Sequence, residues 1–144
     1  MHACIDNFIH TYAGVELRLK MHEIMTKQGH EEETGKAKIT SGYNLPAKYV
    51  LHTVGPIIQW KVTQEDENLL ASCYKECLKL AADTGVESIA FCCLSTGVFR
   101  FPQQRAAEIA TETVMQFLKK DDRIKKVIFN VFKNEDLEIY SHLL

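Results

Sequence analysis

Apolar residues recur every three or four positions along five stretches of the chain, which is the spacing of a single helix face. This pattern predicts helices over residues 5–14, 15–25, 63–84, 102–120 and 134–144. Gly14 separates the first two helices, and Gly85 follows the third. Thr63 is expected to cap the third helix with Asp66 three residues later, and Pro102 suits the first turn of the fourth.

Shorter apolar runs predict strands over residues 36–40, 47–54, 88–94 and 125–132. The run at 47–54 is nearly continuous, so we expect it to be buried on both faces, and we expect the two later runs to be buried as well. Strands that alternate with helices indicate an α/β sandwich with a largely parallel sheet. Such sheets usually have about five strands or more, and here helices stand where a first strand is expected.

Composition, charge and cysteine content narrow the class of protein. With 144 residues, 46% of them hydrophobic and 25% charged, the chain has the size of one globular domain, residues 1–144. A net charge of −2 provides no basic face for nucleic acid or for an anionic membrane. No apolar run approaches the roughly 20 residues of a membrane span. The five cysteines are odd in number and most lie in apolar patterns, which favours a reducing, cytoplasmic setting.

The clearest candidate for chemistry is the turn CLSTGVFRFP, which joins a predicted strand to a predicted helix. Its small residues allow the backbone N–H groups of residues 96–100 to face one concavity. With the start of the next helix, these groups would suit an anion such as a diphosphate. The turn also lies at the carboxyl end of a strand, where α/β sheets bind ligands. An ordinary strand-to-helix turn has the same pattern, so that alternative stays open.

Two other stretches contain side chains that can do chemistry. His52 lies in the middle of an apolar strand, where a hydrogen-bonded core histidine is more usual than a catalytic one. His2 and Cys4 are both metal-binding types, and Asp6 follows them closely. Two ligands do not make a zinc site, so the spacing alone favours no metal centre.

Three segments together resemble the macrodomain family: HACIDNFIHTYAGVELR, GKAKITSGYNLPAKYVLHTVGP and CLSTGVFRFPQQRAAEIA. More narrowly, the chain resembles the zinc-containing bacterial macrodomains that act as protein-ADP-ribose hydrolases. The resemblance extends over nearly the whole chain, and the second and third segments are its most specific motifs. It implies a three-layer α/β/α sandwich with a mixed, macrodomain-like sheet.

The resemblance also implies roles for single residues. Asp6 matches the aspartate near the ribose that carries the bond to be cleaved, and His2 and Cys4 match two of three zinc ligands. Phe132 matches an aromatic residue that packs near the adenine. The loop that wraps the diphosphate matches Ser95, Thr96, Gly97, Val98 and Phe99.

Arg100 departs from the pattern, because many macrodomains have a second glycine at its position. Its side chain either touches the ligand or points to solvent, and the sequence leaves both alternatives open.

Members of the family usually have several dozen residues before the position of Met1. Those residues supply the first strands, part of the adenine pocket, an asparagine-rich loop and the first zinc cysteine. We therefore expect an N-terminally truncated macrodomain whose sheet lacks its first strands, with a functional short form as the alternative. Zinc binding should be weak unless water, Asp6 or another chain completes the ligands. Uncovered apolar strands should favour a homo-oligomer.

By this resemblance the protein is a hydrolase that removes mono-ADP-ribose from an acidic side chain of a modified protein. Asp6 would orient or deprotonate the attacking water, and the loop at 95–99 would fix the diphosphate. Zinc on His2 and Cys4 would polarise the ribose or supply hydroxide. Two alternatives stay open: a module that binds ADP-ribose or a related nucleotide without turnover, and an inactive fragment that keeps only the fold.

Overall fold

Helices and strands alternate in the computed structural model, which describes residues 5–144. In chain order the elements are α1 Ile5–Ala13, α2 Val15–Gln28, β1 Ala37–Ser41, β2 Tyr49–Thr53, α3 Gln64–Asp83, β3 Ser88–Phe91, α4 Gln103–Leu118, β4 Lys126–Phe129 and α5 Asn134–Leu143. All five predicted helices and all four predicted strands are present. β1 is as long as predicted and lies one residue later, whereas the other three strands are shorter than the apolar runs that predicted them.

Local signals explain where the helices begin and end. Gly14 separates α1 from α2 and has φ +91°, a conformation that suits glycine. The predicted cap of α3 is confirmed, because the Thr63 side chain accepts from the Asp66 N–H at 3.2 Å and Asp66 accepts from the Thr63 N–H at 2.9 Å. Pro102 precedes the first residue of α4 rather than lying inside its first turn.

The strands form two separate pairs within the described part of the chain. β1 and β2 are antiparallel, with Ile39 opposite Leu51, and β3 and β4 are parallel, with Ile89 opposite Val127. The prediction of a mixed sheet is therefore confirmed, and the expectation of a largely parallel one is wrong. The short turn between β1 and β2 explains the difference, since a connection that short returns the chain antiparallel.

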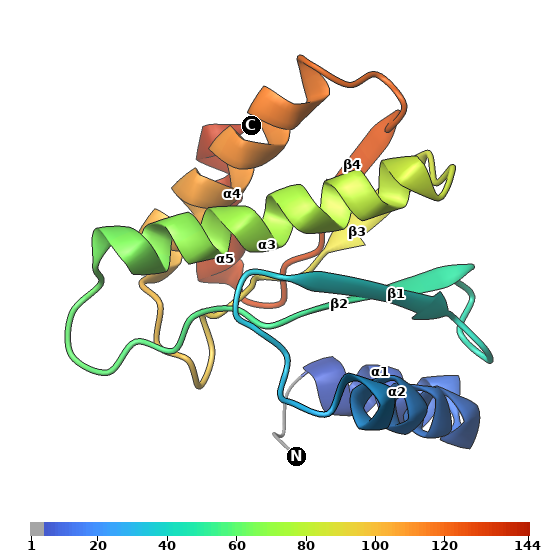
Figure 1. The fold of residues 1–144 in the computed structure, drawn as a ribbon. Helices are drawn as coiled ribbons and strands as arrows, with labels where there is room; N and C mark the ends of the chain where they lie inside the picture. The colour runs from blue at the N-terminus through green and yellow to red at the C-terminus, as the bar shows by residue number, and fades with distance from the viewer. Residues whose placement is uncertain (1–4) are drawn as a thin grey trace.

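Helices cover the strands on two sides. Figure 1 shows α3 running along one side of the β1–β2 pair, with α1 and α2 on the other side. The same helix continues past the β3–β4 pair, where α4 and α5 also lie (Figure 1). The result is an α/β sandwich in which α3 connects both strand pairs.

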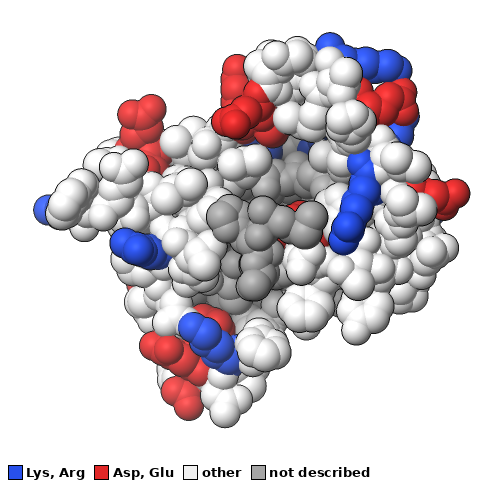
Figure 2. Space-filling model, turned by 90° about the horizontal axis from the view of Figure 1, so that it is seen from below, with Lys and Arg blue, Asp and Glu red and all other residues white. Residues whose placement is uncertain are grey.

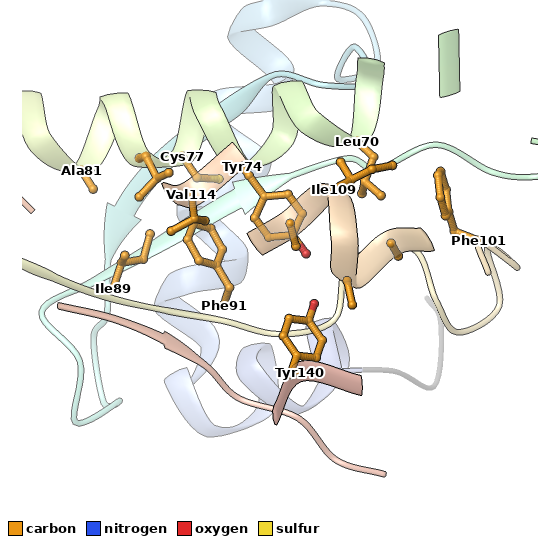
Figure 3. Close-up of a cluster of buried hydrophobic side chains, with 14 of the residues drawn as sticks. Leu70, Tyr74, Cys77, Ala81, Ile89, Phe91, Phe101, Ile109, Val114 and Tyr140 are labelled. Carbon is orange, nitrogen blue, oxygen red and sulfur yellow. The ribbon is translucent and has the colours of Figure 1, made fainter. Parts of the chain in front are cut away.

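The main hydrophobic core lies between α3, α4, α5 and the β3–β4 pair. Tyr74 of α3 is fully buried, and its ring meets that of Phe91 edge-on at 5.0 Å between centroids (Figure 3). Phe91 is also stacked on Phe129, which in turn contacts Tyr140 of α5. Chain segments far apart in sequence thus meet around one cluster of aromatic rings.

The strands are less covered than the sequence predicted. All five residues of β2 are partly exposed, although the run at 47–54 was expected to be buried on both faces. β3 alternates, with Ser88 and Ala90 exposed, and Ile128 of β4 is 43% exposed. A strand is buried on both faces only where helices cover both faces and other strands flank both edges. Here each strand has a single strand neighbour among the described residues.

Charged side chains of both signs are interspersed over the face shown in Figure 2, with no large area of one sign. Among residues 5–144, no helix is long and apolar enough to span a membrane.

Candidate functional site

The loop between β3 and α4 closes on itself through its own carbonyl groups. The Arg100 N–H donates to the Gly97 carbonyl at 3.0 Å, and the Phe101 N–H donates to the Ser95 carbonyl at 3.0 Å. Ser95 and Arg100 both have φ +61°, a left-handed conformation that is uncommon outside glycine. Such residues often mark functional sites, because the surrounding structure must offset their strain.

Several N–H groups of this loop remain available to a ligand. Those of Ser95, Thr96, Gly97 and Val98 donate to no group in the described part of the chain. Consecutive unpaired N–H groups in a turn that leads into a helix are a common way to bind a phosphate. Of the predicted donors, the N–H groups of Thr96, Gly97 and Val98 are thus available among the described residues, whereas the Arg100 N–H is used within the loop. The ligand of the loop stays a prediction.

The segment after β2 supports the loop from one side. The Ile58 N–H donates to the Phe99 carbonyl at 2.8 Å. A Cβ on Gly55 would lie 2.1 Å from Ser95 Oγ, so only glycine lets the two segments come this close. The same Ser95 Oγ is buried and has no hydrogen-bond partner among the described residues. The Ser95 hydroxyl at the start of the loop can therefore still form a hydrogen bond.

A hollow of about 460 Å³ lies beside the loop. Its lining residues are Ile57, Ile58, Gln59, Trp60, Val98 and Arg100. Trp60 is 95% exposed, and Arg100 is exposed as well. The sequence left the direction of the Arg100 side chain open, and the structure places this residue at the wall of the hollow.

The parallel pairing of β3 and β4 brings a second segment to the same edge of the molecule. Parallel strands end on the same side, so residues 130–133 after β4 lie at the edge that carries the loop after β3. Phe132 in this segment is 98% exposed. An exposed aromatic ring suits stacking on a base, and its predicted role near the adenine stays a prediction.

Asp6 lies in the first turn of α1, at the wall of a groove of about 360 Å³. Its carboxylate is 64% exposed, and its Oδ1 lies 3.7 Å from Nε2 of His10, one helical turn later. The His10 side chain is only 16% exposed, and its Nδ1 has no hydrogen-bond partner within residues 5–144. A carboxylate with open access and a mostly buried histidine therefore form a pair at this wall.

His52 of β2 lies behind this pair. Its Nε2 shares a hydrogen bond of 2.9 Å with the Thr40 hydroxyl, and its ring centroid lies 6.1 Å from that of His10. Burial, together with the neighbouring His10, lowers the pKa of His52 to about 4, and Asp6 opposes this shift. His52 is therefore neutral at pH 7. It is hydrogen-bonded, as expected for a structural histidine, although it lines the groove rather than the core.

The groove also connects Asp6 to the loop. Leu94, the residue before Ser95, lines the same groove as Asp6, His10 and His52. The structure thus places Asp6 close to the start of the loop at 95–99, although 88 residues of sequence separate Asp6 from Leu94. This juxtaposition depends on the tertiary structure and was expected from the family resemblance alone.

The predicted metal ligands His2 and Cys4 lie outside the described residues. Within residues 5–144 no group of three or more histidine, cysteine, aspartate or glutamate side chains is arranged to hold a metal ion.

Sequence reasoning missed His10 and Thr40 as parts of the site. The spacing of Asp6 and His10, four residues apart on a helix, was a signal that places both side chains on one face. Nothing local indicates that the Thr40 hydroxyl contacts His52, because the two residues belong to different strands.

The fold and the site define an α/β domain in which a loop with available N–H groups lies near an exposed carboxylate. The model of the Macro domain family matches residues 1–110, and the chain belongs to this family.

Similar proteins support the assignment to this family. The chain is 59% identical over 143 residues to a protein-ADP-ribose hydrolase of Treponema medium, and 57% identical over 141 residues to one of Staphylococcus aureus. These matches cover 99% and 97% of this chain but only 55% and 53% of the relatives. The chain thus spans about half the length of the curated relatives it matches.

Solved structures show the same fold. An Oceanobacillus iheyensis macrodomain with ADP has a TM-score of 0.91 at 39% identity, and the match covers 99% of this chain and 75% of that one. A Trypanosoma brucei macrodomain in complex with ADP-ribose has a TM-score of 0.83 at 34% identity, covering 98% and 56%.

Proposed function

We propose that this chain binds ADP-ribose and hydrolyses the bond between mono-ADP-ribose and an acidic side chain of a modified protein. The observation that supports this most strongly is the groove that both Asp6 and Leu94 line, because Leu94 directly precedes the loop with available N–H groups. The names of the relatives, protein-ADP-ribose hydrolase, and the ADP-ribose and ADP complexes of similar structures support the same ligand class.

In this proposal the loop holds the ligand and does not take part in bond breaking. The N–H groups of Ser95, Thr96, Gly97 and Val98 donate to the diphosphate oxygens. A ligand fixed at its diphosphate has its distal ribose confined to the space beside the loop. Phe132 is proposed to contact the adenine at the same edge.

Asp6 is the proposed catalytic residue. Its carboxylate accepts a hydrogen bond from a water molecule and orients it toward C1″ of the ribose. The water oxygen bonds to C1″ while the bond from C1″ to the side-chain oxygen breaks, and the leaving carboxylate takes the electron pair. The proton from the water passes to Asp6 and then to solvent. His10, 3.7 Å from Asp6, limits the positions of that carboxylate.

We further propose that His2 and Cys4 contribute to a weak zinc site near Asp6. A bound zinc ion would act there as a Lewis acid. The proposed roles of Asp6 and the loop do not depend on this metal. Elemental analysis of the purified chain tests this part. Stoichiometric zinc that is lost in a His2→Ala variant would show that binding is stronger than proposed.

Asp6→Asn separates binding from turnover. We expect the variant to bind ADP-ribose within about threefold of the wild type in isothermal titration calorimetry, because the loop is intact. Release of ADP-ribose from a modified acidic substrate should fall at least about a hundredfold, since the base is lost. Asp122→Asn is the matched control, because the Asp122 side chain is 97% exposed.

The outcomes distinguish the alternatives. If the wild-type chain binds ADP-ribose but does not release it from the substrate, the chain is a binding module. If it does not bind ADP-ribose at all, it keeps only the fold. Turnover by Asp6→Asn at the wild-type rate would contradict the proposed role of Asp6.

We also propose a reducing, cytoplasmic compartment and self-association. Cys73, Cys77, Cys92 and Cys93 form no disulfide in the described part of the chain, which suits a reducing compartment. Exposed Trp60 and the partly exposed strands offer apolar surface to a second copy. Light scattering tests self-association, and a monomer at all concentrations would contradict it.

A further inference from the structure

The hollow of about 460 Å³ follows the groove of the proposed catalytic carboxylate along the same two chain segments. Residues 50–54 of the first segment and Leu94 of the second line the groove. The close approach of Gly55 and Ser95 comes next along both segments. Residues 57–60 and the far end of the loop then line the hollow, on the side of the molecule where α3 begins (Figure 1). The groove and the hollow are therefore neighbours.

The hollow has an exposed apolar surface. Three large apolar side chains at its wall, those of Ile57, Trp60 and Val98, are exposed to solvent. Single exposed apolar residues are ordinary on a protein surface, whereas several around one hollow indicate a place where another molecule binds. Tryptophan and arginine are the residues that most often dominate such contacts, and Arg100 lies at the same wall.

Arg100 adds a positive charge that nothing in the described part of the chain neutralises. Its side chain forms no hydrogen bond or ion pair with residues 5–144, whereas Arg105 and Arg123 each bind carboxylates of this chain. Its φ of +61° is one that glycine adopts more easily, so an arginine is kept here at some cost in backbone strain. Its guanidinium group is therefore available for a carboxylate of another molecule.

The loop at 95–99 connects the hollow to the bond that would be cleaved. In the proposed function, its available N–H groups hold the diphosphate, and the distal ribose is confined to the space beside it. The side chains of Val98 and Arg100, at the end of the same loop, form part of the hollow. A polypeptide bonded to that ribose must leave the groove of Asp6, and the hollow is the next site along the same segments.

We propose that the hollow binds the part of the modified protein next to the modified acidic residue. Trp60 covers an apolar side chain of that polypeptide, and Arg100 binds a second carboxylate within it. The charge of Arg100 and the exposed apolar wall match a segment that is both acidic and apolar. This inference rests on the proposed function and adds that the chain selects modified proteins by the sequence around the modification.

Two synthetic peptides, each ADP-ribosylated on one glutamate, test the proposal. In the first, a leucine and a second glutamate flank the modified residue, and in the second glycine and glutamine take their places. Asp6→Asn protein is used, so that the peptides stay intact. In calorimetric titration the first peptide should bind at least about tenfold more tightly than the second. Trp60 is the single tryptophan of the chain, so its fluorescence reports on the hollow directly. The first peptide should shift its emission to shorter wavelength, because the indole ring leaves water.

Variants in the same Asp6→Asn protein assign the preference to single side chains. Arg100→Gly should reduce the preference for the first peptide at least about fivefold, and its affinity for free ADP-ribose should stay within about threefold. Its thermal midpoint should change by no more than about 3 °C, because glycine adopts the same φ without strain. Trp60→Ala should also reduce the preference. Arg18→Ala, at an exposed position of α2, is the matched control and should keep it.

The outcomes separate this inference from the proposed function. If free ADP-ribose binds but the two peptides bind equally, the inference is overturned and the proposed ligand stands. The same holds if Arg100→Gly keeps the full preference, or if the first peptide is preferred without a change in Trp60 emission. If free ADP-ribose does not bind at all, the proposed function fails and this inference fails with it.

Discussion

The part of the molecule from α3 onward is closely packed, whereas the part that contains α1, α2 and the β1–β2 pair is open. The main core cluster lies entirely between Ile58 and Tyr140. In the earlier part, Ala13 and Leu17 are the buried hydrophobic residues among those described. Asp6, His10 and His52 all belong to the open part, and the loop at 95–99 belongs to the packed part.

The packed part mainly provides stability, and the open part provides the accessible groups. The packed part holds the loop in an uncommon backbone conformation, and such strain is kept only where the surrounding structure is rigid. The open part exposes a carboxylate and a groove, which suit access by a ligand. We therefore expect mutations in the two parts to act on different measurable properties.

The largest effect is expected for Leu70→Ala in the packed part. Leu70 is fully buried in α3, so its truncation should cost about 3 kcal/mol of unfolding free energy. Leu51→Ala in β2, where the side chain is partly exposed, should cost about 1 kcal/mol. Urea unfolding followed by circular dichroism measures both. Equal losses for the two variants would show that the parts do not differ in packing.

The pH dependence of stability should reveal His52 in the open part. Its pKa is about 4 in the folded chain and near 6.5 when unfolded, so the unfolded chain takes up the proton first as the pH falls. The stability that neutral His52 contributes is fully present above pH 6.5. It is lost progressively as the pH falls toward 4, and the loss in unfolding free energy reaches about 3 kcal/mol. His52→Asn should remove this loss, and His22→Asn, on the exposed face of α2, should not. The same pH profile in all three proteins would contradict the assignment.

Gly97→Ala tests whether the loop of the packed part binds the ligand. A Cβ at Gly97 would meet nothing within 4 Å, so the unfolding free energy should change by less than about 0.5 kcal/mol. A methyl group on the loop should hinder close approach of the diphosphate and weaken ADP-ribose binding about tenfold. Calorimetric titration measures the affinity, with Gln116→Ala on the exposed surface of α4 as the control. Unchanged affinity would exclude the loop as the diphosphate site.

The smallest effect is expected for the ion pair that joins α3 to α4. Arg105 donates from Nε and Nη2 to the two carboxylate oxygens of Glu67, at 2.7 Å each, and these hydrogen bonds lower the pKa of Glu67. The stability that this ion pair contributes is present at pH values above the ordinary pKa of glutamate, and it is lost as the pH falls and Glu67 is protonated. Glu67→Gln should lower the urea midpoint slightly at pH 7 and at low salt, and Glu112→Gln should leave it unchanged. A larger loss than for Leu70→Ala would contradict the ranking.

The helices could be predicted from the sequence because their signals are local. The Thr63–Asp66 cap and the break at Gly14 depend on residues a few positions apart. Pro102 was predicted inside the first turn of α4, and it directly precedes the helix instead. The strand positions were also predicted, but their burial was not. A continuous apolar run shows only that the strand is hydrophobic. Whether both faces of the strand are covered depends on elements far away in the sequence.

The candidate site divides in the same way. The sequence by itself determined the loop with its small residues, the Asp6–His10 spacing and the family resemblance, since each is written in neighbouring residues. Only the tertiary structure decided that Leu94 lines the groove of Asp6 and that Thr40 meets His52. It also decided that the strands stay in two pairs, because strand pairing requires contacts between segments whose proximity the whole fold creates.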